Sequence, residues 1–292
     1  MDVAARASWA LQIACSRDDL GFTDWHHAAS TLAGACALPS ATGLDGRALE
    51  QAMELSAERH RRMAKRPPLP EVQGEADAEL ADLLTFTTTA LRHGGLATSY
   101  VGLAMRAAEL AGRPLQTLER TRLTRVVRSV LAAREVDRYL GAAREAPPDL
   151  PADPAAAAEL LLDRAFAQLE AIQPDQIYRG ARTAFVGELI HGVVHGYAVM
   201  QVLRLAPQIA RPAVTRWAEQ LEAQQALCDA RAPQQFDELE PPPSLGYLDV
   251  LGAGFDDPEK LQFACCANEL WRARGKPADW EPLIGRALAA LE

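Results

Sequence analysis

The sequence predicts an all-α protein built from repeated helical hairpins, and two observations lead to that prediction. No sustained alternation of Val, Ile and Thr appears, whereas Ala, Leu, Glu and Arg dominate long stretches with apolar residues three and four apart. Three proline-rich breaks, at 66–74, 146–154 and 240–243, interrupt these stretches, because proline lacks an amide donor and disfavours helix just before it. Four helical segments result, at about 1–65, 75–145, 155–232 and 245–292.

The second and third of these segments align with each other without gaps at an offset of 98 residues. LRHGG at 91–95 falls on LIHGV at 189–193, and AELAGRP at 108–114 falls on APQIARP at 206–212. The first segment joins at an offset of 66 residues, which places His27 on His93. Matches of this kind indicate an internal repeat.

The second segment shows the content of one unit. A helix with His93 near its start runs through Tyr100 and ends near Gly112, because glycine suits the position after a helix. Pro114 suits the first turn of the next helix, where its missing amide costs nothing. Three such hairpins and a C-terminal helical pair are expected to form a single domain over 1–292. They would pack as a bundle, a solenoid or a closed α/α array around a central pocket.

Histidines occupy equivalent places in the three units. His27, His93 and His191 would lie at one level of the array, and in a curved or closed array that level faces a common interior. The alternative is that each histidine is a core residue that hydrogen-bonds a carbonyl. Convergence of the three imidazoles is therefore a hypothesis that a structure can test.

The segment LIHGVVHGY at 189–197 carries two histidines four residues apart, so His191 and His195 share one face of a helix with Glu188. These three side chains could bind a metal ion, which is kept as an alternative. No second helix supplies another carboxylate and histidine, so we expect no metal.

A glycine follows each of these histidines, at Gly192 and Gly196, which indicates close helix approach or space left for a ligand. Aromatic side chains would line a pocket there with flat apolar surfaces and hydroxyl donors. The candidates are Tyr100, Tyr178, Tyr197, Phe185 and Trp217.

Charge and motifs exclude several functions. The formal net charge of −9 and the pI near 5.3 argue against nucleic acid as the main partner. No apolar run approaches the ~20 residues that span a bilayer, and a cytoplasmic protein is expected. Neither a P-loop nor GxGxxG after a strand is present, so no nucleotide or flavin cofactor is expected.

Three stretches resemble the questin oxidase-like family: 24–38 (DWHHAASTLAGACAL), 185–227 (FVGELIHG to QQAL) and 256–288 (DDPEKLQF to GRAL). Each begins with a helix like one of that family, and together they cover about half the chain. The resemblance implies a cofactor-independent oxygenase of Baeyer–Villiger type in secondary metabolism. Its partners would be an aromatic, polyketide-like substrate and dioxygen.

Such chemistry needs a general base that deprotonates an electron-rich phenol, which can then reduce oxygen directly. Histidine is suited to this because its ordinary pKa of about 6.5 lies near working pH. The expected base is His191, with His93 and His195 as hydrogen-bonding partners. Substrate or oxyanion contacts are expected from His27, Tyr197 and Arg182.

A helical-repeat module that binds a small molecule or a protein without chemistry is the main alternative, because repeat arrays commonly present a groove. A metal-dependent oxygenase using Glu188, His191 and His195 is the second alternative. An enclosed aromatic cavity reached by several histidines would favour the enzyme. Whether the protein forms a homodimer is left open.

Overall fold

The structure is a computed structural model, and it confirms the all-α fold class. It describes residues 2–17, 26–41, 44–63, 85, 95–132, 149–172, 176–177, 186–229, 237–238 and 258–291. The helices are α1 (Val3–Ala14), α2 (His26–Ala37), α3 (Leu44–Arg62), α5 (Leu96–Leu110), α6 (Thr117–Ala132), α7 (Pro154–Gln168), α8 (Val186–Leu205), α9 (Ala210–Asp229), α11 (Pro258–Ala273) and α12 (Trp280–Ala290). Short 3₁₀ turns follow three of them, at Leu38–Ser40, Leu169–Ala171 and Pro207–Ile209. One antiparallel pair joins β1 (Gln176–Ile177) to β2 (Asp237–Glu238).

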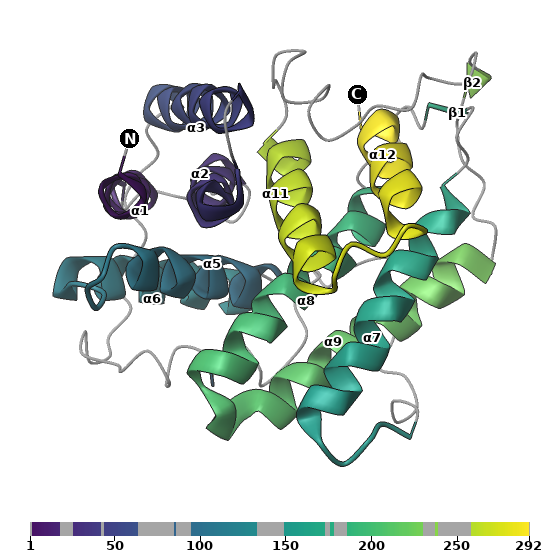
Figure 1. Ribbon diagram of the computed structural model, residues 1–292. Coiled ribbons are helices and arrows are strands. Elements are labelled where there is room, and N and C mark those ends of the chain that lie inside the picture. The colour runs from purple at the N-terminus through teal and green to yellow at the C-terminus, as the bar shows by residue number, and fades with distance from the viewer. Residues whose placement is uncertain are drawn as a thin grey trace.

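Four helices form a ring at the centre of the described part of the chain. α2 packs on α5, α5 on α8, α8 on α11 and α11 on α2. The other helices lie outside this ring: α1 and α3 against α2, α6 against α5, α7 and α9 against α8, and α12 against α11 (Figure 1). The consecutive pairs α2–α3, α5–α6, α8–α9 and α11–α12 each have their first helix in the ring and their second outside. In the predicted first and third units a further helix, α1 or α7, precedes the pair, and the repeat itself stays a prediction.

α2 and α8 are deeply enclosed, as is α5. α2 is buried at every position from Ala28 to Ala37, and α8 is buried from Gly192 to Val199. α2 is surrounded by four other helices and α8 by five, which explains why neither keeps a polar face. Alanine and glycine predominate in α2, and these small side chains allow its neighbours to approach closely.

The ring helices α2 and α11 run in the same direction. Near their starts the hydroxyl of Ser30 donates to the carbonyl of Pro258, and near their ends the hydroxyl of Ser40 donates to the carboxyl of Glu269. The thiol of Cys36 donates to the carbonyl of Leu103 on α5 at 3.6 Å. The last turns of α2 and α11 therefore lie close together, beside the second half of α5.

The ring helices α5 and α8 also run in the same direction. Gly102 lies so close to α8 that a Cβ built on it would be 2.9 Å from Cβ of Ala198. About two helical turns further along both helices, Arg204 pairs with Glu109. The C-terminal halves of α5, α8 and α11 consequently meet at one end of the ring, where a hollow of the described surface is found.

The hairpin of α5 and α6 tests two local predictions. Gly112 has a φ of 66° just after α5, as expected of a glycine that ends a helix. The placement of Pro114 in the first turn of α6 is wrong, because α6 begins only at Thr117. Glu119 explains the later start of α6. Its carboxylate accepts a hydrogen bond from the backbone N–H of Gln116 at 2.8 Å and also binds the Arg113 guanidinium.

No helix in the described part of the chain is both long enough and apolar enough to cross a membrane.

Candidate functional site

The histidine face of α8 is buried against α9. His195 is 1% exposed, and its Nδ1 lies 2.7 Å from Oε1 of Gln220 on α9. Burial lowers the pKa of His195 to about 4, and the hydrogen bond with Gln220 opposes only part of that effect. His195 is therefore a neutral imidazole at neutral pH.

The same ring of His195 explains the glycine that precedes α5. Gly95 has a φ of 74°, and a Cβ built on it would lie only 2.1 Å from Nδ1 of His195. The backbone just before the first residue of α5 therefore lies directly against the imidazole of His195. His195 is enclosed by α8, α9 and the N-terminus of α5.

Several polar atoms along this α8–α9 contact have no hydrogen-bond partner among the described residues. They are Nε2 of His191, Nε2 of His195, Nε2 of Gln220 and Oε1 of Gln224. Each is shielded from solvent, and buried polar groups ordinarily are paired or hold ordered water. We call these four residues the α8–α9 seam.

The glycines after the two histidines are explained by packing. A Cβ on Gly192 would lie 2.4 Å from Oε1 of Gln224, and one on Gly196 would lie 2.4 Å from Cζ2 of Trp217. Trp217 also donates its indole N–H to the carbonyl of Gly192 at 2.9 Å. Of the two predicted explanations, close helix approach holds at both positions, and these glycines leave no space for a ligand.

The other predicted histidines lie elsewhere or outside the described residues. His27 is on α2, half-buried, with Nδ1 3.5 Å from Oγ of Ser56 on α3. Burial lowers its pKa, and the charges of Arg59 and His26 lower it further. His93 lies outside the described residues, so the convergence of His27, His93 and His191 stays a prediction.

A metal site on Glu188, His191 and His195 is not found. Although all three residues lie in the described α8, no group of three or more His, Cys, Asp or Glu in the described ranges is placed to hold a metal ion. The α8–α9 contact explains this, because His195 is engaged with Gln220 rather than with Glu188. The alternative of a metal-dependent oxygenase therefore lacks its ligand set.

The predicted aromatic lining separates into different places. Tyr100 is fully buried and donates its hydroxyl to the carbonyl of Ala14 on α1 at 3.1 Å, so it fastens α5 to α1. Trp217 is in the α8–α9 core. Tyr197 lines a hollow that no described histidine reaches, whereas Arg182, Phe185 and Tyr178 lie outside the described residues.

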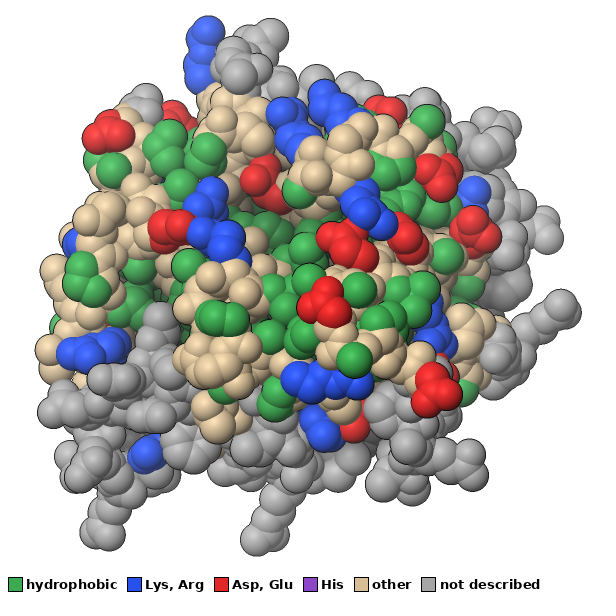
Figure 2. Space-filling model, turned by 60° about the horizontal axis from the view of Figure 1, so that its bottom comes forward, with side chains coloured by type: hydrophobic (Ala, Val, Ile, Leu, Met, Phe, Trp, Pro, Cys, Tyr) green, Lys and Arg blue, Asp and Glu red, His purple; other side chains and the backbone are tan. Residues whose placement is uncertain are grey.

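That hollow lies among α5, α7, α8 and α11 and measures about 400 Å³. Its apolar lining comes from Leu162, Met200, Leu270 and Ala273, and its polar lining from Arg106, Arg204, Arg274, Glu159, Glu269, Tyr197 and Gln201. We call it the arginine pocket. Figure 2 shows one face of the molecule on which green hydrophobic side chains lie in hollows between blue and red ones, with no purple histidine among its described residues.

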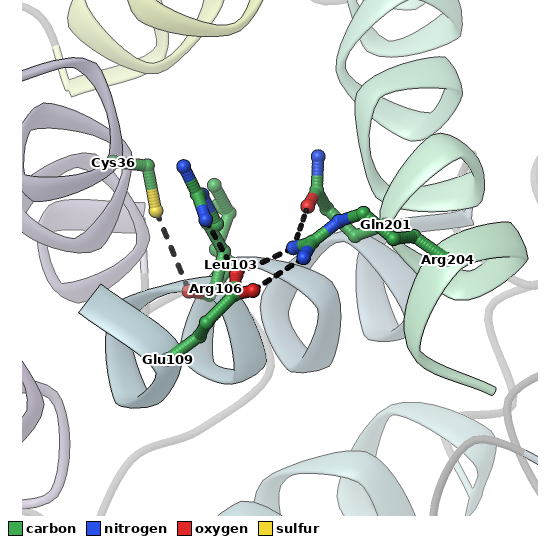
Figure 3. Close-up of polar contacts among 6 residues, drawn as sticks. All are labelled: Cys36, Leu103, Arg106, Glu109, Gln201 and Arg204. Carbon is green, nitrogen blue, oxygen red and sulfur yellow. Dashed lines mark hydrogen bonds and ion pairs between the residues drawn. The ribbon is translucent and has the colours of Figure 1, made fainter. Parts of the chain in front are cut away.

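Two of the pocket arginines share one carboxylate. Glu109 accepts from Arg106 on its own helix and from both terminal nitrogens of Arg204 on α8 (Figure 3). These hydrogen bonds, that from Arg204 above all, lower the pKa of Glu109 to about 2. The Glu109 carboxylate is therefore ionised throughout the neutral range and keeps both guanidinium groups in place.

The remaining charges of the pocket are also engaged. Arg274 pairs with Glu159 on α7 and lies 3.2 Å from Oδ2 of Asp163. Glu269 accepts the hydroxyl of Ser40, but burial outweighs this bond and raises the pKa of the Glu269 carboxyl. Burial likewise raises the pKa of Tyr197 well above its ordinary value, so its hydroxyl stays protonated.

The arginine pocket and the histidine face lie on different sides of α8. His195 and Tyr197 are two residues apart, and at about 100° per residue their side chains point roughly 200° apart around the helix. His195 meets α9, whereas Tyr197 lines the pocket. A molecule in the arginine pocket would therefore not reach the imidazole of His195.

Sequence reasoning missed the three arginines of this pocket. Arg106 and Arg204 each have an acidic or amide neighbour at helical spacing, Glu109 and Gln201, which is typical of a solvated helix face. Nothing in that spacing shows that α5 and α8 meet at these positions. Gln220 and Gln224 were missed for the same reason.

Comparison with protein-family models, with curated proteins and with solved structures yields no match to this chain. The resemblance to the questin oxidase-like family accordingly stays a prediction.

Proposed function

We propose that this protein binds a small organic molecule in the arginine pocket. The observation that carries the proposal is a hollow of about 400 Å³ with both an apolar and a polar lining. Small-molecule sites typically measure about 300–1,000 Å³ and combine an apolar surface with a few fixed polar groups. The volume of the pocket lies in this range, and its lining combines four apolar residues with a larger polar set.

The lining offers binding groups in defined states. Leu162, Met200 and Leu270 supply apolar surface from three different helices. The protonated hydroxyl of Tyr197 and the side chain of Gln201 supply polar contacts on α8. A ligand with an apolar body and one polar end fits this distribution.

Filling the pocket is expected to abolish binding. In a screen of aromatic and aliphatic fragments by ligand-observed NMR, hits should lose at least about tenfold in affinity when Met200 is replaced by Trp, because the indole occupies the hollow. Leu118→Trp is the matched control, since Leu118 is 58% exposed on α6 and does not line the pocket. Fragments that bind Met200→Trp with the same affinity as the parent protein would contradict the proposal.

A second candidate is the cofactor-independent oxygenase, with chemistry at the α8–α9 seam. It is favoured by two imidazole nitrogens, Nε2 of His191 and of His195, which are shielded from solvent without hydrogen-bond partners among the described residues. A neutral imidazole with an open nitrogen can take the proton of a phenol. In this candidate His191 is the base and His195 its partner.

Oxygen uptake tests this second candidate. Against a panel of reduced polycyclic phenols, His191→Gln and His195→Gln should each abolish dioxygen consumption while the helical circular-dichroism spectrum is kept. His26→Gln is the matched control, because His26 lies on α2 and pairs with Glu259 on α11, away from the seam. Turnover that survives both seam substitutions would remove the histidines from the chemistry.

A further inference from the structure

We infer that the arginine pocket selects a small carboxylate with an apolar body, received by Arg106 and Gln201. This inference rests on the proposed binding function of the pocket and adds the class of molecule that it takes. It stands on the hydrogen-bond arrangement around Glu109, which leaves particular donors unoccupied (Figure 3).

The first step concerns Arg106. A guanidinium carries five N–H donors in a rigid fork. Arg106 gives Nη1 to Glu109, and no other hydrogen bond of its guanidinium is formed with the described residues. Its side chain is 26% exposed, so the remaining donors are accessible from the hollow. In Figure 3 the free end of this guanidinium points away from Glu109.

The second step concerns Gln201. Its Oε1 accepts from Nη2 of Arg204 at 3.0 Å, which determines the orientation of the amide. The amide nitrogen is therefore turned outward, and Figure 3 shows it pointing to the same side as the free end of Arg106. The charged guanidinium of Arg106 on α5 and the neutral amide of Gln201 on α8 thus face a common space.

The third step concerns charge. Arg106 and Arg204 share the single carboxylate of Glu109, whereas Arg274 has two acidic partners, Glu159 and Asp163. Because two guanidinium groups share one carboxylate, the part of the pocket around Arg106 carries more positive than negative charge. Glu269, the other acid near Arg106, is engaged by the hydroxyl of Ser40 on η1 (Leu38–Ser40).

The fourth step concerns the rest of the ligand. Met200 lies one residue before Gln201, and Leu162 and Leu270 complete the apolar lining from α7 and α11. A carboxylate at Arg106 would therefore extend its body over apolar surface. Benzoate, 1-naphthoate and 3-phenylpropionate have this form.

The experiment compares each of these acids with its primary amide, which has the same shape and no charge. By titration calorimetry the acids should bind at least tenfold more tightly than the amides, as expected of charge-assisted hydrogen bonds. Arg106→Gln should weaken acid binding about tenfold or more and leave amide binding within twofold. Arg164→Gln is the matched control, because Arg164 has the same 26% exposure and pairs with Glu222 outside the pocket.

A second variant keeps the test decisive if Arg106→Gln unfolds. Gln201→Leu removes the neutral donor, and it should weaken the acids severalfold. Higher ionic strength should weaken the acids and leave the amides unchanged.

The outcomes separate the inference from the proposed function. Acids and amides that bind equally well, in a manner that Met200→Trp abolishes, would overturn carboxylate selection and leave the binding function standing. If neither series binds in that manner, the binding function itself fails for ligands of this form.

Discussion

Replacement of Gly95 by alanine should destabilise the fold by roughly 2–5 kcal/mol, measured as the free energy of unfolding in urea. Gly95 has a φ of 74°, a backbone conformation that costs an L-residue about 1–2 kcal/mol. The added methyl would also lie 2.1 Å from the His195 ring, and overpacking of a filled core typically costs about 1–3 kcal/mol more. Movement of the buried imidazole away from this methyl would also disturb the hydrogen bond between its Nδ1 and Gln220.

Gly112→Ala separates the two contributions. Gly112 has a similar φ of 66°, but a Cβ there would meet nothing within 4 Å, so only the backbone cost of about 1–2 kcal/mol is expected. Removing the imidazole should also relieve the clash. In a His195→Ala background, Gly95→Ala should therefore lower the free energy of unfolding by less than it does in the parent protein. Equal costs for Gly95→Ala and Gly112→Ala would show that the imidazole does not lie against the α5 start.

Acidification from pH 6.5 to pH 4 should reduce the free energy of unfolding by about 3 kcal/mol through His195 alone. Its pKa is about 4 in the folded protein and near 6.5 when unfolded. Between these values the unfolded chain binds a proton that the folded protein does not, so stability rises with pH. The contribution is fully present above pH 6.5 and is lost as the pH falls toward 4.

The measurement is a series of urea unfolding curves at several pH values on the parent protein and on His195→Gln. His27, whose pKa is also lowered by burial, acts in the same direction, but it is present in both proteins and cancels in the difference. The parent protein should therefore lose about 3 kcal/mol more than the variant over this range. Parallel curves would show that His195 is not a buried neutral imidazole.

Local chemistry explains which features could be predicted from the sequence. The all-α class follows from apolar spacing, and the end of α5 near Gly112 follows from the conformational freedom of glycine. The start of α6 was placed wrongly at Pro114, because Glu119 binds both the Gln116 amide and Arg113. A side chain that serves two partners at once moves a helix boundary in a way that proline spacing does not reveal.

The candidate site shows a sharper division. Spacing along one helix put His191 and His195 on one face, because α-helical geometry is local. It did not separate Tyr197 from them, although Tyr197 lines a hollow on the other side of α8. It left open whether the glycines beside the histidines made room for a ligand or for another helix. Trp217 and Gln224 on α9 answered this, and both are brought there by packing between α8 and α9.

The sequence by itself determined the all-α class, the end of α5 near Gly112 and the common face of His191 and His195 on α8. Only the tertiary structure decided what each side meets: Gln220 and Gly95 for His195, and a hollow with Arg106 and Gln201 for Tyr197. The physical reason is that helix formation depends on neighbours three and four residues apart. A pocket depends on side chains from helices more than a hundred residues apart in sequence, which become neighbours only when the ring of α2, α5, α8 and α11 closes.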